Sequence, residues 1–153
     1  MIRELNADEV DGAISLVNRV FLRFVSPDFD EQGRVTFANY MRHKADDYAA
    51  DIVSGYRRIW GYFDGSRLCG VIALRGDSHI SLLFVVEPYQ HRGIATELLK
   101  FLRHWLLPHG ARYMTVNSAP GAVGFYEKCG FVAVGEMQQK DGIRHLPMEY
   151  KIR

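Results

Sequence analysis

Apolar residues recur at two different spacings along the chain, and the change from one spacing to the other outlines the fold. In the first third, residues 10–21 place apolar side chains at helical intervals, and Asn6 followed by Glu9 three residues later is typical of a helix start. A short strand at 2–5 is expected before this helix. From 32 to 54 the apolar pattern is looser and predicts either one broken helix or two short ones.

The middle of the chain is predicted to form strands. Residues 58–63 and 68–74 are two strand-like runs joined by Asp64-Gly65, a dipeptide that favours hairpin turns. A second turn at Gly76-Asp77 leads to 80–86, a nearly continuous apolar run of the kind found in strands covered on both faces. The three runs therefore predict an antiparallel meander whose third strand is buried at the centre.

The last third alternates helices and strands. The predicted elements are, in order, a helix at 93–107, a strand at 113–117, a short helix at 120–128, and strands at 131–137 and 146–152 separated by an Asp141-Gly142 turn. A strand, a crossover helix and a second strand form a parallel unit, which is expected to be right-handed. The pattern predicts one α+β domain spanning 1–153, in which a meander, a crossover and a hairpin follow one another.

Composition and charge exclude several classes of protein. The 153 residues suit a single domain, and 19 basic against 18 acidic side chains give no reason to expect binding to nucleic acid or to a membrane surface. No apolar run approaches the roughly 20 residues of a membrane span, and the N-terminus is too short and too charged for a signal peptide, so the cytoplasm is the expected location. Cys69 and Cys129 are expected to be reduced thiols. The histidines show no metal-binding spacing, so no metal is expected.

The segment with the clearest chemical signal is Gln90–Thr96, which follows the buried strand and opens the best-defined helix. The first turn of a helix has backbone N–H groups without partners and a partial positive charge. Small residues such as Gly93 and Ala95 let an anion come close to that backbone. A phosphate or pyrophosphate would bind well there. Taken alone, the pattern is weak and is better explained by a plain strand-to-helix connection that contains a glycine.

A second segment changes that balance. Gln90-His91-Arg92-Gly93-Ile94-Ala95 resembles motif A of the GNAT superfamily of N-acetyltransferases, and the stretch 117–131, NSAPGAVGFYEKCGF, resembles its motif B. The order of the predicted elements also matches that superfamily along essentially the whole chain. The resemblance implies a three-layer αβα fold. Its central sheet would be mixed and mainly antiparallel, with a β-α-β crossover and a splayed central strand.

The resemblance also implies acetyl-CoA as co-substrate, with its pantetheine arm lying along the splayed strand. The residues implied in binding it are Phe84, Val85, Val86, Gln90, His91, Arg92, Gly93, Ile94, Ala95, Thr96, Asn117 and Tyr126. Pro88 departs from the motif by one position, so either Val85 or Val86 supplies the amide that contacts the acetyl group. Register counted from Gln90 favours Val85. Tyr126 matches the tyrosine that similar enzymes use as general acid, and a phenol with a pKa of about 10 keeps its proton at neutral pH.

The general base is open from sequence alone. His79 has the best-matched unperturbed pKa and is the preferred candidate, while four other residues and a water chain remain alternatives. These residues are Ser81, Glu87, Glu136 and His145. The acceptor is expected to be a primary amine of a small molecule, an antibiotic or a peptide. It is expected to bind between the region 21–56 and the last hairpin.

Two other functions compete with amine acetylation. A catalytically silent acyl-CoA-binding sensor would keep the cofactor site without turnover. A nucleotide-binding α/β protein would use the glycine loop for another phosphate, although the antiparallel meander before the loop speaks against it. Similar proteins are often homodimers, so a second copy of the chain is an expected partner.

Overall fold

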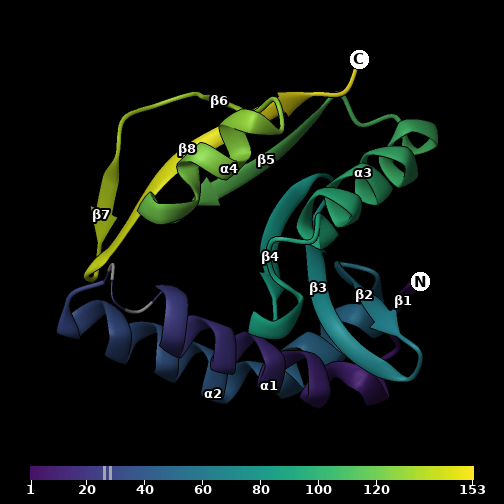
Figure 1. Ribbon diagram of the computed structural model, residues 1–153, viewed down its shortest axis with the longest axis horizontal. Helices are drawn as coiled ribbons and strands as arrows, with labels where there is room; N and C mark the ends of the chain where they lie inside the picture. The colour runs from purple at the N-terminus through teal and green to yellow at the C-terminus, as the bar shows by residue number, and fades with distance from the viewer. Residues whose placement is uncertain (26, 28) are drawn as a thin grey trace.

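The computed structural model describes residues 1–25, 27 and 29–153, with the side chains of residues 24, 25 and 41–46 outside that description. The elements follow one another as β1 (Ile2–Glu4), α1 (Val10–Val20), α2 (Glu31–Ser54), β2 (Arg57–Asp64), β3 (Arg67–Arg75), β4 (His79–Val85), α3 (Ile94–Leu106), β5 (Tyr113–Ser118), α4 (Val123–Lys128), β6 (Val132–Ala133), β7 (Gln138–Lys140) and β8 (Ile143–Lys151) (Figure 1). One π-helical turn, Phe21–Val25, follows α1. The predicted capping box at Asn6 and Glu9 is confirmed.

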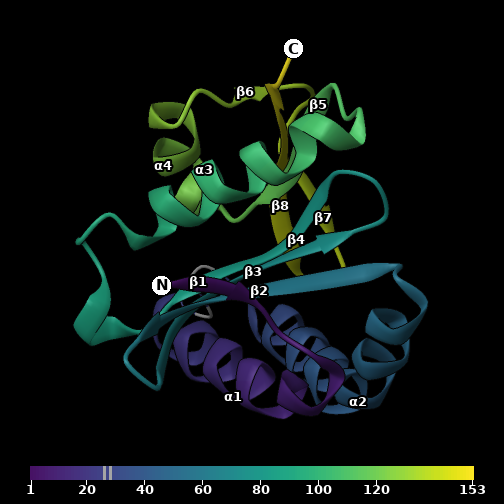
Figure 2. The ribbon, with the colours of Figure 1, turned by 90° about the vertical axis from the view of Figure 1, so that its right-hand side faces the viewer.

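The described strands form one central layer between two helical layers (Figure 2). Neighbouring strands lie in the order β1-β2-β3-β4-β5-β8-β6, and β7 pairs with β8. Every pair is antiparallel except β4–β5, which is the parallel pair expected from the crossover helix. Helices α1 and α2 cover one face of the sheet, and α3 and α4 cover the other. The α+β class, the meander and the β-α-β crossover are therefore confirmed.

Helix α2 is one continuous element of 24 residues, not a broken helix or a pair. Its N-terminus is capped by Asp30, whose carboxylate accepts the Gly33 N–H at 2.8 Å. It ends at Gly55, which takes the left-handed conformation with φ 84°. The apolar stripe is weak because much of the helix faces solvent. The sequence therefore shows no clear helical periodicity across α2, although the helix is capped at both ends.

The central strand β4 parts from β5 after a very short ladder. The two strands pair only at His79 with Thr115 and at Ile80 with Val116, whereas β3 accompanies β4 as far as Val85. An irregularity in the β3–β4 register falls at Ser81, directly after the last β4–β5 pair. Beyond that point none of the described strands lies beside the outer edge of β4 (Figure 1). This is the splayed central strand that the resemblance implied.

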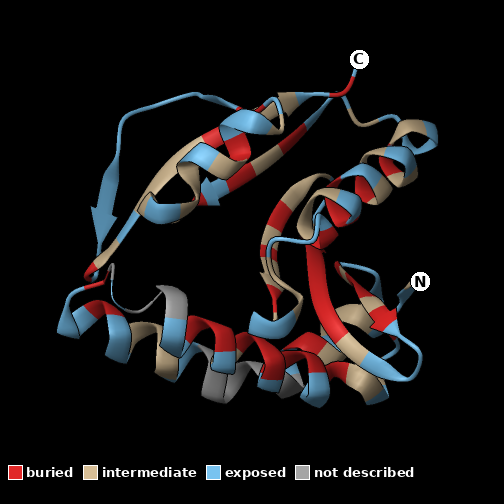
Figure 3. Cartoon of the chain, viewed as in Figure 1, coloured by how far each residue is buried: buried red, intermediate tan, exposed pale blue. Residues whose placement is uncertain are grey.

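The strand predicted at 131–137 was wrong in extent. Only β6, at 132–133, pairs with β8, and the chain then crosses to β7 over an exposed stretch (Figure 3). The Val134 N–H still donates to the Pro147 carbonyl at 2.9 Å. Pro147 itself has no N–H to return to the partner strand, so the ladder cannot continue there. Strand β8 starts at Ile143, three residues earlier than predicted, because Ile143 already pairs with Lys140 of β7.

Two apolar clusters hold the helical layers on the sheet. The cluster beneath α3 and α4 includes Trp60, Leu98, Leu102 and Met148, each 2% exposed or less. The cluster beneath α1 and α2 is lined on the sheet side by β2, β3 and β4. Burial of this much apolar surface on both faces fixes which face each strand residue shows. The edge of β4 that leaves β5 lies between the two clusters, which places an opening in the middle of the molecule.

Candidate active site

A cavity of about 350 Å³ opens where β4 leaves β5. Its walls come from α1, β4, the start of α3 and the segment that leads into α4. The lining residues are Val20, Leu83, Phe84, Val85, Gln90, Ala95, Ala119, Gly121, Ala122, Phe125 and Tyr126. Among them Tyr126 is the one side chain that titrates. The cavity is therefore mostly apolar, and its polar chemistry is carried by backbone groups, the Gln90 amide and one phenol.

The direction of the β4 amides decides which valine faces the cavity. The Val86 N–H donates to the Cys69 carbonyl on β3 at 2.9 Å, so it is used inside the sheet. Val85, one residue earlier, is paired with Gly70. Residues along an antiparallel strand point their N–H and C=O groups alternately toward one neighbouring strand and the other, so those of Val85 point away from β3. The Val85 carbonyl indeed accepts a hydrogen bond from Gln90 Nε2 at 2.8 Å. Its N–H consequently points toward the cavity.

The loop between β4 and α3 has the backbone shape that an anion site needs. His91 and Gly93 both have positive φ, 62° and 82°, and α3 begins directly after them at Ile94. The first N–H groups of the helix have no partners within it. In the described part of the chain, no atom other than those of its immediate neighbours lies within 4 Å of the position that a Gly93 side chain would occupy, so the approach to these amides is open. Backbone N–H groups and the helix dipole favour a phosphate at this point.

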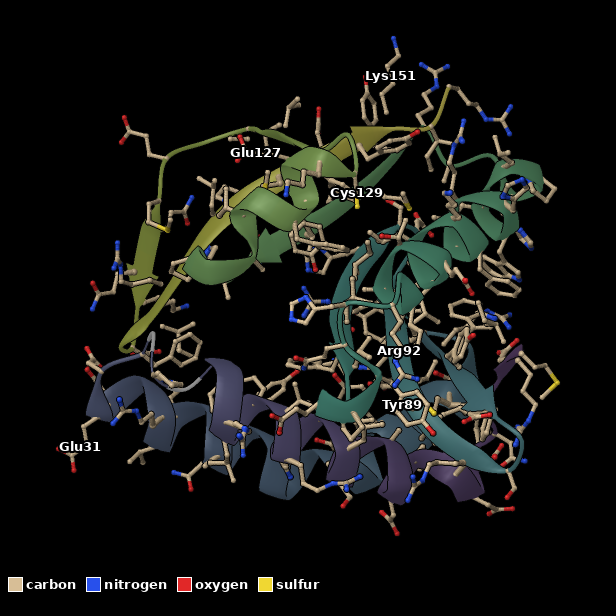
Figure 4. The ribbon with its side chains drawn as sticks, in the orientation of Figure 1. Glu31, Tyr89, Arg92, Glu127, Cys129 and Lys151 are labelled. Atoms are coloured by element: carbon tan, nitrogen blue, oxygen red, sulfur yellow. The ribbon has the colours of Figure 1, made fainter. Side chains whose placement is uncertain are left out.

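Side chains tie this loop to its surroundings. The Tyr89 hydroxyl donates to the Asp64 carboxylate at 2.8 Å, which joins the loop to the β2–β3 turn. The Arg92 guanidinium lies over the Tyr89 ring, 5.3 Å from its centroid (Figure 4). Glu87 pairs with Arg23 after α1 at 3.0 Å. Sequence reasoning missed Asp64 and Tyr89, because they are 25 residues apart and only the folded chain brings them together.

Tyr126 extends from α4 into the cavity wall and is 6% exposed. The rings of Phe125 and Phe131 pack against it edge-on, with both centroids at 5.3 Å. Burial, and to a smaller extent the neighbouring Cys129, raises the pKa of Tyr126 above its ordinary value of 10.0. The phenol therefore keeps its proton at neutral pH, in a position where it can donate into the cavity.

Two predicted site residues lie outside this cavity. Asn117 is exposed on β5, paired with Pro147, and is not among the lining residues. His79 starts β4, at the end where β4 and β5 are still paired, and four residues of strand, roughly 13 Å, separate it from Leu83. Burial, and then the charge of Arg75, lowers the pKa of His79 below 6.5. The structure thus does not bring His79 and Tyr126 together in this cavity.

The two segments expected to bind the acceptor, the region 21–56 and the last hairpin, are in contact with each other. Gly33 of α2 packs so closely on Gly142 that a Cβ on Gly33 would overlap the Gly142 carbonyl. The Thr36 hydroxyl donates to the Asp141 carbonyl at 3.1 Å across 105 residues of sequence. We call these four residues, Gly33, Thr36, Asp141 and Gly142, the hairpin latch. It holds the tip of the β7–β8 hairpin against the first turns of α2 (Figure 1).

Comparisons with known proteins agree with this geometry. The model of the acetyltransferase (GNAT) domain matches residues 25–152. A GCN5-related N-acetyltransferase from Rhodopseudomonas palustris superposes with a TM-score of 0.86 at 19% identity, covering 99% of this chain and 94% of its own. The PaiA N-acetyltransferase from Thermoplasma acidophilum, in complex with coenzyme A, gives 0.79 at 20% identity, covering 99% and 98%. An aminoglycoside 6'-N-acetyltransferase complexed with coenzyme A gives 0.73 at 15% identity, covering 100% and 97%.

The fold thus places a splayed β4, a loop with two residues of positive φ before α3, and a buried phenol around one cavity. The chain belongs to the GNAT acetyltransferase family, whose model covers most of its length. No curated protein sequence matches it significantly. Among the described residues, no helix is long and apolar enough to cross a membrane.

Proposed function

We propose that this protein transfers an acetyl group from acetyl-CoA to a primary amine. The observation that carries the proposal is the cavity at the splay, which is lined by both Val85 and Tyr126. Family membership supports acyl transfer, and two structural relatives have coenzyme A bound. The proposed pyrophosphate site is the first turn of α3 with Gly93 before it, and Arg92 supplies positive charge beside it.

The Val85 N–H is the proposed donor to the thioester carbonyl. As the acceptor nitrogen bonds to the carbonyl carbon, negative charge gathers on the oxygen, and a fixed N–H stabilises it. A single donor of this type is commonly worth about 3 kcal/mol in the transition state. The choice of Val85 over Val86 is supported by the bond that the Val86 N–H already makes to the Cys69 carbonyl. The carbon–sulfur bond then breaks as the sulfur takes a proton from Tyr126. The extra proton on the former amine nitrogen passes through water to the Tyr126 phenolate, so that the products are a neutral amide and the coenzyme A thiol.

Tyr126 is the proposed general acid. It gives its proton to the departing coenzyme A sulfur, and its raised pKa means that it is fully protonated before the step. The acceptor ammonium must also lose a proton before it can attack. We assign that step to His79 acting through water, because its lowered pKa keeps it neutral and able to accept at pH 7. The cytoplasmic location and the homodimeric state remain predictions from the sequence.

The test is release of free thiol from acetyl-CoA over a panel of primary amines, with wild type compared with Tyr126→Phe. Removing the phenol should lower kcat by about 100-fold or more, the usual contribution of a general acid. Affinity for coenzyme A should stay within two-fold. Tyr113→Phe is the matched control, because Tyr113 lies on β5 with 40% exposure and outside the cavity.

Two results would contradict the proposal in different ways. A Tyr126→Phe protein with the wild-type rate would remove the general acid from the mechanism. A wild-type protein that binds acetyl-CoA and releases no thiol with any amine would favour the sensor function instead.

A further inference from the structure

Three polar side chains lie in one cross-strand row beside the splay. His79 of β4 is in register with Thr115 of β5, and Thr115 is in register with Glu149 of β8. His79 Nδ1 and Thr115 Oγ1 are 2.9 Å apart. Directly opposite residues of an antiparallel pair have Cβ atoms about 5 Å apart on the same face, a distance that a glutamate side chain spans. The row therefore aligns a histidine, a threonine and a glutamate in register, with the imidazole and the hydroxyl already within hydrogen-bonding distance of each other.

The row faces away from α3 and α4. The next residues along the three strands, Ile80, Val116 and Met148, are buried in the cluster beneath those helices. Side chains alternate between faces, so His79, Thr115 and Glu149 belong to the opposite face, the one that α1 and α2 cover farther along the sheet. All three are partly exposed. Since the β4–β5 ladder ends one residue later, the row stands at the closed end of the splay.

The hydrogen bond to Thr115 restricts what His79 can do. Nδ1 is occupied, so an outside proton can be taken only at Nε2, and that requires the tautomer with hydrogen on Nδ1. The Thr115 hydroxyl has a single proton. If that proton is directed to Glu149, its oxygen must accept from Nδ1–H, and Nε2 is left with its lone pair. Among the described residues Glu149 makes no ion pair, so its oxygens are available for this bond.

We propose that Thr115 and Glu149 are positioning residues that hold His79 in the Nδ1–H tautomer, with Nε2 ready to take the acceptor amine's proton through water. The proton passes from the ammonium to water and from water to Nε2, which leaves a neutral amine and an imidazolium. This inference rests on the proposed function, because it names the partners of its base. Charged side chains flank His79 on three elements: Arg75 on β3, Asp77 in the turn before β4, and Glu149 on β8.

Nitrogen NMR of the His79 ring tests the tautomer without any acceptor. Wild type should show hydrogen on Nδ1, and Thr115→Val should move the population toward Nε2–H, the form that a free histidine side chain prefers in water. Thr115→Ser should restore the wild-type spectrum, because it restores the hydroxyl. Glu149→Gln should shift the tautomer in the same direction as Thr115→Val and lower the pKa of His79 further, since it removes a negative charge. Glu127→Gln, on α4, is the control and should change neither.

Kinetics then test the role in turnover. With an amine that wild type acetylates, Thr115→Val should lower kcat about ten-fold, with the KM for acetyl-CoA unchanged and Thr115→Ser recovering the rate. Hydrogen on Nε2 in wild type, or a Thr115→Val spectrum identical to wild type, would overturn the tautomer assignment. A shifted tautomer with an unchanged kcat would show that His79 is not the general base. Absence of turnover in wild type would instead contradict the proposed function and with it the base, while the NMR result still decides the tautomer.

Discussion

The regions proposed to bind the cofactor and the acceptor, which we call the cofactor side and the acceptor side, are built in opposite ways. The cofactor side is a nearly contiguous stretch, from β4 through the loop into α3, and its useful groups are backbone amides whose direction follows from strand register and helix start. The acceptor side joins α2 to the β7–β8 hairpin through contacts such as Thr36 to Asp141, 105 residues apart. One region is set by local conformation, and the other exists only once the whole sheet has formed.

This difference has a chemical consequence. A thioester and a pyrophosphate are the same in every reaction of this type, and backbone amides recognise them without demanding particular side chains. An acceptor differs from enzyme to enzyme, and the walls proposed for it here come from segments that are distant in sequence. Changes on one side should therefore leave the other nearly untouched, and the predictions below use that independence.

The largest expected effect is on the cofactor side. Gly93→Val places a branched side chain over the first turn of α3 and strains a residue with φ 82°. Affinity for coenzyme A should fall about 100-fold, which corresponds to about 2.7 kcal/mol, as measured by calorimetric titration. Gly110→Val is the matched control, because Gly110 has φ 81° and equally open surroundings but lies at the far end of α3. Both variants should lose stability through backbone strain, about 1 to 2 kcal/mol, and only Gly93→Val should lose binding.

The second prediction concerns the acceptor side and the free energy of unfolding. The same substitution, glycine to alanine, should lower it at one helical position and raise it at another. Gly33→Ala puts a methyl group into the Gly142 backbone and should destabilise the fold by about 2 kcal/mol in denaturant unfolding. Gly12→Ala in α1 meets no atom of the described residues within 4 Å beyond its own helix, and should stabilise the fold by up to about 1 kcal/mol, since alanine is the better helix former. Neither should change coenzyme A affinity by more than two-fold. A stabilising Gly33→Ala would show that the hairpin latch is not closed in solution.

The smallest effect concerns the tie between the loop and the β2–β3 turn. Tyr89→Phe removes the hydroxyl that donates to Asp64 and keeps the ring under Arg92. Coenzyme A affinity should fall about two- to three-fold, a modest change because the bond is exposed. Asp64→Asn should have a similar effect, and the double variant should be no worse than either single one. Additive losses would mean that the two residues act separately.

Local patterns predicted much of this structure. The buried strand at 80–86, the helix from 93 and the short helix that holds Tyr126 all follow from periodicity and turn residues nearby in sequence. The motif resemblance added the splay, which β4 and β5 confirm. The assignment of individual cofactor contacts stays a prediction, although the bond from Val86 to Cys69 now favours Val85 as the donor.

What the sequence left open depends on contacts between distant residues. Helix α2 is capped at both ends, by Asp30 and Gly55, but its apolar stripe is weak, so the periodicity of the sequence did not indicate one continuous helix. The short β6 depends on Pro147, a residue of the partner strand. The Tyr89–Asp64 bond and the hairpin latch pair residues 25 and 105 positions apart. No periodicity records such pairs, because either partner alone is an ordinary surface residue.

Calorimetric titration of the purified protein with coenzyme A tests the central claim most directly, because the claim is that backbone amides at the splay and at the start of α3 hold this molecule. The account predicts a measurable heat with one molecule bound per chain, retained in Tyr126→Phe and lost in Gly93→Val. No heat of binding to wild type, or undiminished binding to Gly93→Val, would contradict it.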